Sequence, residues 1–398
     1  MSAPAVIDLE TAPSAHAAEA STPIRLRSLD AYRGFIMFML AAAGFGTVQM
    51  ARKFPDSWWA GAAKQFTHTP WEWGVFWDLI MPAFMLMVGV AMPFSFAKRA
   101  AAGDPPARQL RHALARATLL AVIGTAMMAQ NGRFLNVLTQ IGLGYVFVFL
   151  LLGRGRRTQL AWGAGVLIAW CAAFALYPIP GPSYDFAAAG AKPSDVLEGF
   201  RGHWSRNVSL AADFDRWFLN LLPNDRPFVA HVGSTTTLNF IPATANMLLG
   251  VMAGQVLMSA RPAGAKLRWL LGAGAVCLAL GTAAGFTICP VVKRIWTPSF
   301  ALWSGGLTVW MLAAFYAAID VRGWNRWSLP LEILGMNSLA VYLMTLTWPA
   351  WITKVFRTQL GAGTFTGAYG PVWEHLAVLA VIWLVAWWLW RRRLFFRL

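Results

Sequence analysis

Charge is scarce in this sequence. Asp, Glu, Lys and Arg together make up 13% of its 398 residues, whereas soluble globular proteins average about 25%. Hydrophobic residues make up 58%, the mean hydropathy is +0.51, and apolar runs of about 20 residues, enough to cross a bilayer, recur along the chain. The alternation typical of membrane β-strands is missing from runs such as 80–91. The sequence therefore predicts an all-α, polytopic transmembrane helical bundle.

Cysteine is equally rare. Cys171, Cys277 and Cys289 form no CxxC pair and no disulfide framework. Residues 1–24 lack the basic and apolar regions of a signal peptide and are rich in Ala, Ser, Pro and Glu. We expect a disordered tail there and one transmembrane domain over residues 25–398.

Acidic residues are fewer than basic ones, which gives a formal net charge of +16. Such an excess can indicate nucleic-acid binding, but here the basic residues lie in loops between apolar runs. They are better explained as topology determinants, so we expect the lipid bilayer as a partner and no nucleic acid.

The apolar runs predict about ten spans. Basic residues are more numerous in the loops on the side of the N-terminus, which places both termini in the cytoplasm, and we expect a bacterial inner (cytoplasmic) membrane. The predicted spans cover residues 30–50, 76–97, 113–131, 134–152, 158–178, 238–258, 267–288, 300–319, 331–349 and 373–390.

One polar segment is long. Residues 179–237 contain several acids and a short amphipathic pattern at 210–219. The charge pattern places this loop on the extracytoplasmic side, where we expect it to form a lid or an acceptor-facing cap.

His68 lies in a short polar loop, residues 65–74, on the same side of the membrane as that segment. Imidazole titrates near neutral pH, so His68 is a candidate catalytic base or nucleophile, or else an interfacial histidine that only hydrogen-bonds. Asp78 begins the second span, where an acid is costly unless it is paired or faces a wet cavity. It is a candidate partner that orients His68, as in a catalytic triad; the alternative is an acid favoured by a helix N-terminus.

Further polar side chains interrupt the apolar spans and predict a polar cavity inside the bundle. Each of them alone is also explained by hydrogen bonding between helices. Arg33, one turn into the first span, is the candidate cofactor-binding residue, with pairing to Asp30 as the structural alternative. The candidate substrate-binding residues are Trp71, Asn239, Asn246, Lys293, Trp296, Asn337 and Ser338.

Metal-binding and nucleotide-binding patterns are missing. No two histidines have helical ligand spacing, and no Walker or Rossmann glycine motif is present. We therefore expect no metal.

Several of these stretches, taken in order, resemble the heparan-α-glucosaminide N-acetyltransferase family, including its bacterial NagX-type relatives. No single stretch is specific, but the ordered set across about residues 25–345 is. The matching stretches are 27–34, 68–71, 77–89, 137–141 with Tyr145, 238–250, 293–299 and 335–338.

The resemblance implies transfer of an acetyl group from cytoplasmic acetyl-CoA, the acyl donor, to an amino sugar or related glycan across the membrane. His68 is then catalytic, and a homodimer is plausible. Two departures stand out: Gly44 replaces the family's asparagine near the far end of the first span, and Trp-Asn-Gly becomes Trp-Glu-Trp-Gly at 71–74. The lost amide removes a possible oxyanion donor, worth about 10²–10³ in rate, unless Asn239 or Asn246 substitutes.

Two mechanisms fit the sequence equally well. His68 either attacks the thioester directly or acts as a general base on the acceptor amine. Two other functions compete: a transporter that carries a sugar or anion through the same cavity, and a scaffold with a degenerate site.

Overall fold

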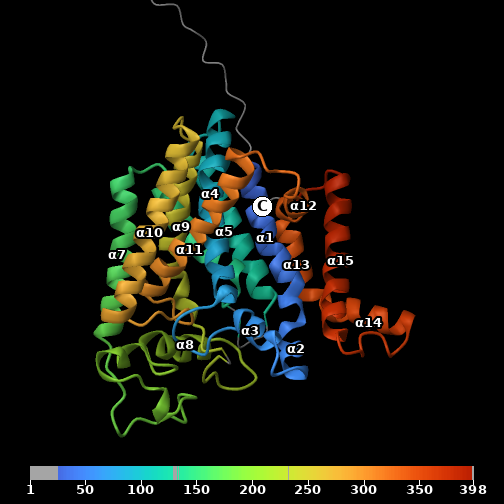
Figure 1. Cartoon of the computed structure of the whole chain (residues 1–398). Coiled ribbons are helices and arrows are strands. Elements are labelled where there is room, and N and C mark those ends of the chain that lie inside the picture. Colours follow the sequence, from blue (N-terminus) through green and yellow to red (C-terminus); the bar gives the residue numbers. More distant parts are fainter. Residues whose placement is uncertain (1–25, 129–131, 133, 232, 397–398) are drawn as a thin grey trace, which may run out of the picture.

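The computed structural model describes residues 26–128, 132, 134–231 and 233–396. Within these ranges the regular structure is helical, and the only β pairing is an isolated antiparallel bridge between Glu72 and Val292. The helices form an upright bundle with a less regular segment at one end (Figure 1). The prediction of an all-α protein is confirmed for these residues, while the predicted tail, residues 1–24, lies outside them.

Seven segments among the described residues are long and apolar enough to cross a membrane. They are α1 (Arg27–Ala42) with η1 (Ala43–Gly46) and α2 (Thr47–Lys53); η2 (Phe76–Leu79) with α4 (Ile80–Ala101); α7 (Arg156–Ala175); η6 (Thr237–Asn239) with α9 (Phe240–Met258); α10 (Ala263–Thr287); α11 (Pro298–Phe315) with η7 (Tyr316–Val321); and α15 (Gly370–Arg391). The pair α12 (Leu329–Met336) and α13 (Ser338–Thr347), bent by 83°, makes an eighth if it is counted as one span.

The predicted count of about ten spans is not confirmed. Helix α5 (Pro106–Ala126) carries Arg108, Arg111 and Arg116. Helix α6 (Val137–Leu151) has 15 residues, fewer than the roughly 20 that cross the hydrocarbon core. Apolar runs overcount spans because a helix buried inside a bundle is as apolar as one that faces lipid.

The remaining helices are short and lie mostly at one end of the bundle. The start of α1 and the end of α15 lie at the opposite end (Figure 1). Helix α8 corresponds to the amphipathic helix predicted at 210–219. The short helices are α3 (Trp58–Gln65), η4 (Pro193–Asp195), η5 (Gly199–Trp204), α8 (Leu210–Asn220) and α14 (Pro349–Leu360).

Glycines allow close backbone contact at two helix crossings. A Cβ atom on Gly34 of α1 would lie 1.7 Å from a backbone oxygen of α12, and one on Gly335 of α12 would lie 1.8 Å from a backbone oxygen of α1. Gly89 of α4 and Gly250 of α9 meet in the same way. Small residues at such crossings are typical of membrane bundles. The contact of Gly89 with Gly250 holds α4, the helix that follows the His68 loop, closely against α9.

The segment between α7 and η6 packs against the end of the bundle that carries α2 and α3 (Figure 1). Trp204 of η5 is fully buried in a second hydrophobic cluster with Trp170 and Phe174 of α7 and with Ile295. This burial of large aromatic side chains anchors the segment. The structure thus puts the predicted cap beside the His68 loop.

Candidate functional site

The His68 loop is held at both ends by its own polar side chains. Thr67 Oγ1 donates a hydrogen bond to the carbonyl of Ala63 at 2.8 Å, and Gln65 Oε1 accepts one from the backbone N–H of Phe76 at 3.2 Å. The backbone N–H of Trp73 donates to the carbonyl of Val291 at 2.6 Å. The loop is therefore tied to the turn between α10 and α11.

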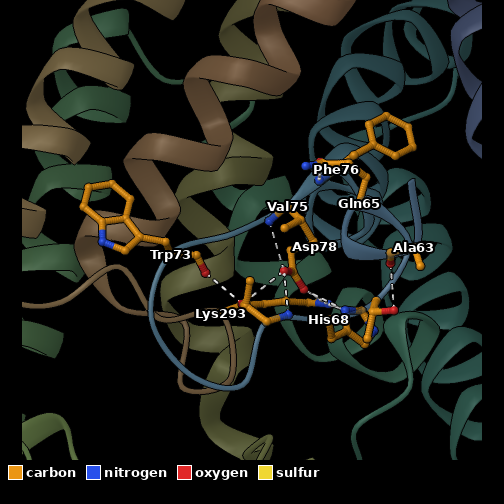
Figure 2. Close-up of polar contacts among 10 residues, drawn as sticks. Ala63, Gln65, His68, Trp73, Val75, Phe76, Asp78 and Lys293 are labelled. Atoms are coloured by element: carbon orange, nitrogen blue, oxygen red, sulfur yellow. Dashed lines mark hydrogen bonds and ion pairs between the residues drawn. The ribbon is translucent and has the colours of Figure 1, made fainter. Parts of the chain in front are cut away.

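Asp78 is the buried centre of the site, with 1% of its side chain exposed. Its Oδ1 lies 2.6 Å from Nδ1 of His68. Its Oδ2 accepts the backbone N–H of Val75 at 3.2 Å and the hydroxyl of Thr69 at 3.3 Å. Figure 2 shows Asp78 between His68 and Val75. Because both oxygens are engaged, the carboxylate is fixed in position.

Lys293 is the third member of the cluster. Its Nζ lies 3.2 Å from Oδ1 of Asp78 and 3.0 Å from Nδ1 of His68 (Figure 2), and 13% of its side chain is exposed. Burial lowers the pKa of Lys293 to about 8, although the Asp78 carboxylate acts in the opposite direction. The cation balances the carboxylate, which lets both charges lie in a largely buried place.

The short contact with Asp78 favours one tautomer of His68. A carboxylate only accepts hydrogen bonds, so the 2.6 Å contact requires the proton on Nδ1. In this tautomer Nδ1 cannot also accept from Nζ of Lys293, so the 3.0 Å approach of that cation is not a hydrogen bond to the ring. This leaves Nε2 with a free lone pair on a ring that is 37% exposed. Burial lowers the pKa of His68, Asp78 opposes this shift and Lys293 reinforces it. His68 therefore has the form required of a nucleophile or a general base.

Buried amides support the turn that carries Lys293. Asn239 Nδ2 donates to the carbonyl of Arg294 at 2.8 Å. Asn246 accepts from the indole of Trp296 at 3.0 Å and donates to the carbonyl of Ala301 at 2.8 Å. In this structure three residues predicted to bind substrate hydrogen-bond to protein groups instead: Asn239, Asn246 and Trp296. A direct contact with substrate would require these hydrogen bonds to break.

The cap contacts the loop through the residues that follow His68. The indole of Trp71 donates to the carbonyl of Trp204 at 3.1 Å. Glu72 forms an ion pair with Arg201 of η5. The predicted substrate-binding residue Trp71 therefore lies at the junction of cap and loop, and Glu72, the departure from the family pattern, has a partner in the cap.

A second polar region lies toward the other end of the bundle, in a cavity of about 470 Å³. Arg33 lines it, with NH1 3.9 Å from Asp30 Oδ1. Arg116 of α5 also lines it and lies over the ring of Tyr145 at 5.1 Å. Ser338, another predicted site residue, is part of the same wall. The cavity thus brings two guanidinium groups together.

Two aromatic rings line part of this cavity. Phe84 of α4 and Tyr342 of α13 both line it, and their ring centroids are 5.8 Å apart. The hydroxyl of Tyr342 donates to Asn136 Oδ1 at 3.2 Å. Phe84 follows Asp78 by six residues, about 9 Å of helix. Phe84 is therefore the lining residue of α4 closest in sequence to Asp78.

Asn337, predicted to bind substrate, and Gly44 both have close contacts within the protein. Asn337 is fully buried, donates to the carbonyl of Leu394 at 3.1 Å and accepts from the N–H of Phe396 at 3.1 Å. Gly44 has φ +67°, and a Cβ atom on it would lie 2.8 Å from the Cβ of Phe66. A side-chain amide at position 44 would therefore have to displace the His68 loop.

Sequence reasoning missed Arg116 and Thr69. Arg116 was attributed to loop topology, because it follows Arg108 and Arg111 in a basic stretch, and only the fold places it in the cavity lining beside Arg33. Thr69 bears no signal beyond its place next to His68. Among the described residues, no group of three His, Cys, Asp or Glu side chains could hold a metal ion.

Comparisons with known proteins give the same resemblance. The chain is 24% identical over 374 residues to heparan-alpha-glucosaminide N-acetyltransferase from Homo sapiens, across 81% of this chain and 52% of that protein. It is 22% identical over 375 residues to the Mus musculus protein of the same name, across 81% and 53%. The chain thus spans about half the length of the curated relatives it matches. A scan against protein-family models found no match. The similarity thus accompanies, among the described residues, seven segments that are long and apolar enough to cross a membrane.

Proposed function

We propose that this chain is a transmembrane acetyltransferase of the heparan-α-glucosaminide N-acetyltransferase family. It takes an acetyl group from acetyl-CoA at the cytoplasmic face and passes it through Nε2 of His68 to an amino sugar or related glycan at the other face. The contact of His68 with Asp78 carries the proposal, because a buried carboxylate 2.6 Å from Nδ1 leaves Nε2 free to react.

The donor binds in the cavity that contains Arg33 and Arg116. Acetyl-CoA carries anionic phosphates, and guanidinium groups bind phosphate oxygens through paired hydrogen bonds. The phosphates cannot cross the bilayer, so this end of the bundle is cytoplasmic, together with both termini. The thioester then approaches His68 past Phe84, whose ring must move aside.

The transfer occurs in two steps. The Nε2 lone pair attacks the thioester carbonyl carbon, the C–S bond breaks, and CoA leaves as a thiolate that takes up a proton. Nδ1 keeps its proton, and the Asp78 carboxylate balances the charge of the acetyl-imidazolium. The acceptor amine then attacks the acetyl carbon, the bond to Nε2 breaks, and the amine loses a proton. His68 returns to its neutral form.

A relay through His68 suits this arrangement of binding regions. The donor cavity lies toward one end of the bundle. The cap lies at the other end, where it contacts Trp71 of the His68 loop. Because the acetyl group rests on His68 between the steps, the donor and the acceptor need not occupy the site together.

The direct test is an acetyl-transfer assay on the purified protein in detergent, with labelled acetyl-CoA and a panel of amino sugars. We expect a labelled N-acetyl product without any membrane gradient, which a transporter would not make. If no acceptor is labelled and acetyl-CoA does not raise the melting temperature, the proposal is wrong.

Replacing Lys293 by methionine is expected to shift the acid limb of the kcat/KM profile for acetyl-CoA to higher pH. His68 acts as the neutral ring, so activity falls as the pH drops below its pKa, which the Lys293 cation helps to keep low. Without the cation this pKa rises. The alkaline limb that Lys293 itself gives near its pKa of about 8 should disappear.

Initial rates across the neutral range, at pH values on both sides of each limb, measure this effect. Lys64→Met removes an exposed cation from α3 and should leave the profile unchanged. An unaltered acid limb in folded Lys293→Met protein would show that Lys293 does not act on His68.

Replacing Phe84 by tryptophan is expected to lower kcat/KM for acetyl-CoA by about tenfold or more, because a larger ring fills the interval between the cavity and Asp78. Phe94→Trp, on the same helix but outside the cavity lining, is the matched control. Steady-state kinetics on both variants decide the point. Equal rates in the two would mean that the donor takes another route.

A further inference from the structure

A separate cavity of about 740 Å³ lies beside α14 and α15, at the same end of the bundle as the cap. Its walls come from the end of α1, η1, α13, α14 and α15, and neither His68 nor Asp78 lines it. A cavity of this volume is the size of a small-molecule binding site. The proposed acetyl transfer makes no use of it.

One side of this cavity is polar and positively charged. Thr353 donates to Glu374 at 3.1 Å, and Arg357 pairs with Glu374 at 3.2 Å. The ammonium group of Lys354, also in the lining, makes no hydrogen bond or ion pair with the residues that the structure describes. Two cations therefore face one carboxylate, which leaves an unbalanced positive charge beside the hydroxyl of Thr358.

The other side is apolar and is formed by residues such as Leu40, Pro349, Ala350 and Val378. A ligand that satisfies both sides must carry an anionic group and a hydrocarbon part. A free anion would leave the apolar wall unused.

Helix α14, which lines one side of the cavity, has the features of a helix that lies in a membrane interface. It projects sideways from the base of α15 (Figure 1). Trp351 is 59% exposed and Leu360 is 69% exposed, while Lys354 and Arg357 form its polar part. Exposed tryptophans with basic residues are typical of interfacial helices. An interfacial position of α14 would put the cavity at the level of lipid headgroups.

We propose that this cavity binds a lipid through its phosphate group. Lys354 and Arg357 bind the phosphate oxygens, and an acyl chain lies along Leu40 and Val378. A basic pocket between membrane helices is a known type of site for anionic headgroups.

The test uses the full-length protein in phosphatidylcholine nanodiscs, with added phosphatidylglycerol and native mass spectrometry to count retained lipids. We expect saturable retention of phosphatidylglycerol over phosphatidylcholine. The double variant Lys354→Gln/Arg357→Gln should weaken it about tenfold or more. Ala350→Trp keeps both cations but fills the cavity, and it should abolish retention as well.

The matched control is Arg52→Gln/Lys64→Gln, which removes two exposed cations from α2 and α3 at the same end. It should retain the lipid like the wild type. Inorganic phosphate, added in a separate arm, should not displace the lipid; displacement would identify a free-phosphate site and overturn the lipid proposal. If the control variant lost as much lipid as the double variant, or if the wild type retained both lipids equally, general surface charge would explain the binding. Either result would also overturn the lipid proposal.

The single variant Lys354→Gln should fold like the wild type, because this side chain has no partner among the described residues. It should still weaken retention of phosphatidylglycerol. Since the experiment measures lipid retention and not acetyl transfer, its outcome is independent of the proposed function.

Discussion

Replacing His68 by alanine is expected to reduce acetyl transfer by at least about 10³-fold, because the variant lacks the group that accepts the acetyl moiety. The ring is 37% exposed, and among the described residues its polar contacts are with Asp78 and Lys293, so folding should be retained. The rate of labelled product formation measures the loss, and the melting temperature checks the fold.

Lys64→Ala is the matched control for this variant. It removes an exposed side chain of α3 close to His68 in the sequence, so its rate should stay within a few-fold of the wild type. Turnover by purified His68→Ala protein close to the wild-type rate would refute the catalytic assignment.

Replacing Asp78 by asparagine is expected to lower kcat by about 10³–10⁴-fold, because an amide can donate to Nδ1 and so place the ring proton on Nε2. The nucleophile is then protonated although the ring remains in place. The variant also leaves the Lys293 cation without its carboxylate partner, which destabilises the fold. The double variant Asp78→Asn/Lys293→Met removes this imbalance and should fold while remaining inactive.

Asp215→Asn controls for the loss of a buried carboxylate. Asp215 of α8 is 2% exposed and accepts the backbone N–H of Thr237 at 2.9 Å, away from His68. Desolvation raises its pKa to about 7, so part of its population is already neutral. We expect this variant to lose some stability and keep its rate. Near-normal kcat in folded Asp78→Asn protein would contradict the tautomer argument.

The length of the apolar runs and the amphipathic period of the sequence predicted much of the bundle, because both reflect whether a helix faces lipid, protein or water. They could not predict the break at η1, where Gly44 and Phe45 have φ of 67° and 56°. Nor could they predict the 83° bend between α12 and α13. Both depend on contacts with distant segments, such as the packing of Gly44 on Phe66.

The pairing of His68 with Asp78 could be anticipated because the two residues are close in sequence and flank one short loop. Lys293 follows His68 by 225 residues, and the fold alone brings it to Nδ1. The sequence marked Asn239 and Asn246 as polar residues in an apolar span. Their partners, backbone carbonyls at positions 294 and 301, carry no signal in the sequence, so substrate contact and support of the turn could not be told apart.

The release of CoA in the absence of acceptor tests the central claim most directly. Purified protein is mixed with labelled acetyl-CoA alone, and free thiol and label on the His68 peptide are followed from the first turnover. The account predicts a rapid burst of about one CoA per chain, with acetyl on His68 and no burst in His68→Ala. Release of CoA only when an acceptor amine is also bound, with no label on the peptide, would contradict it.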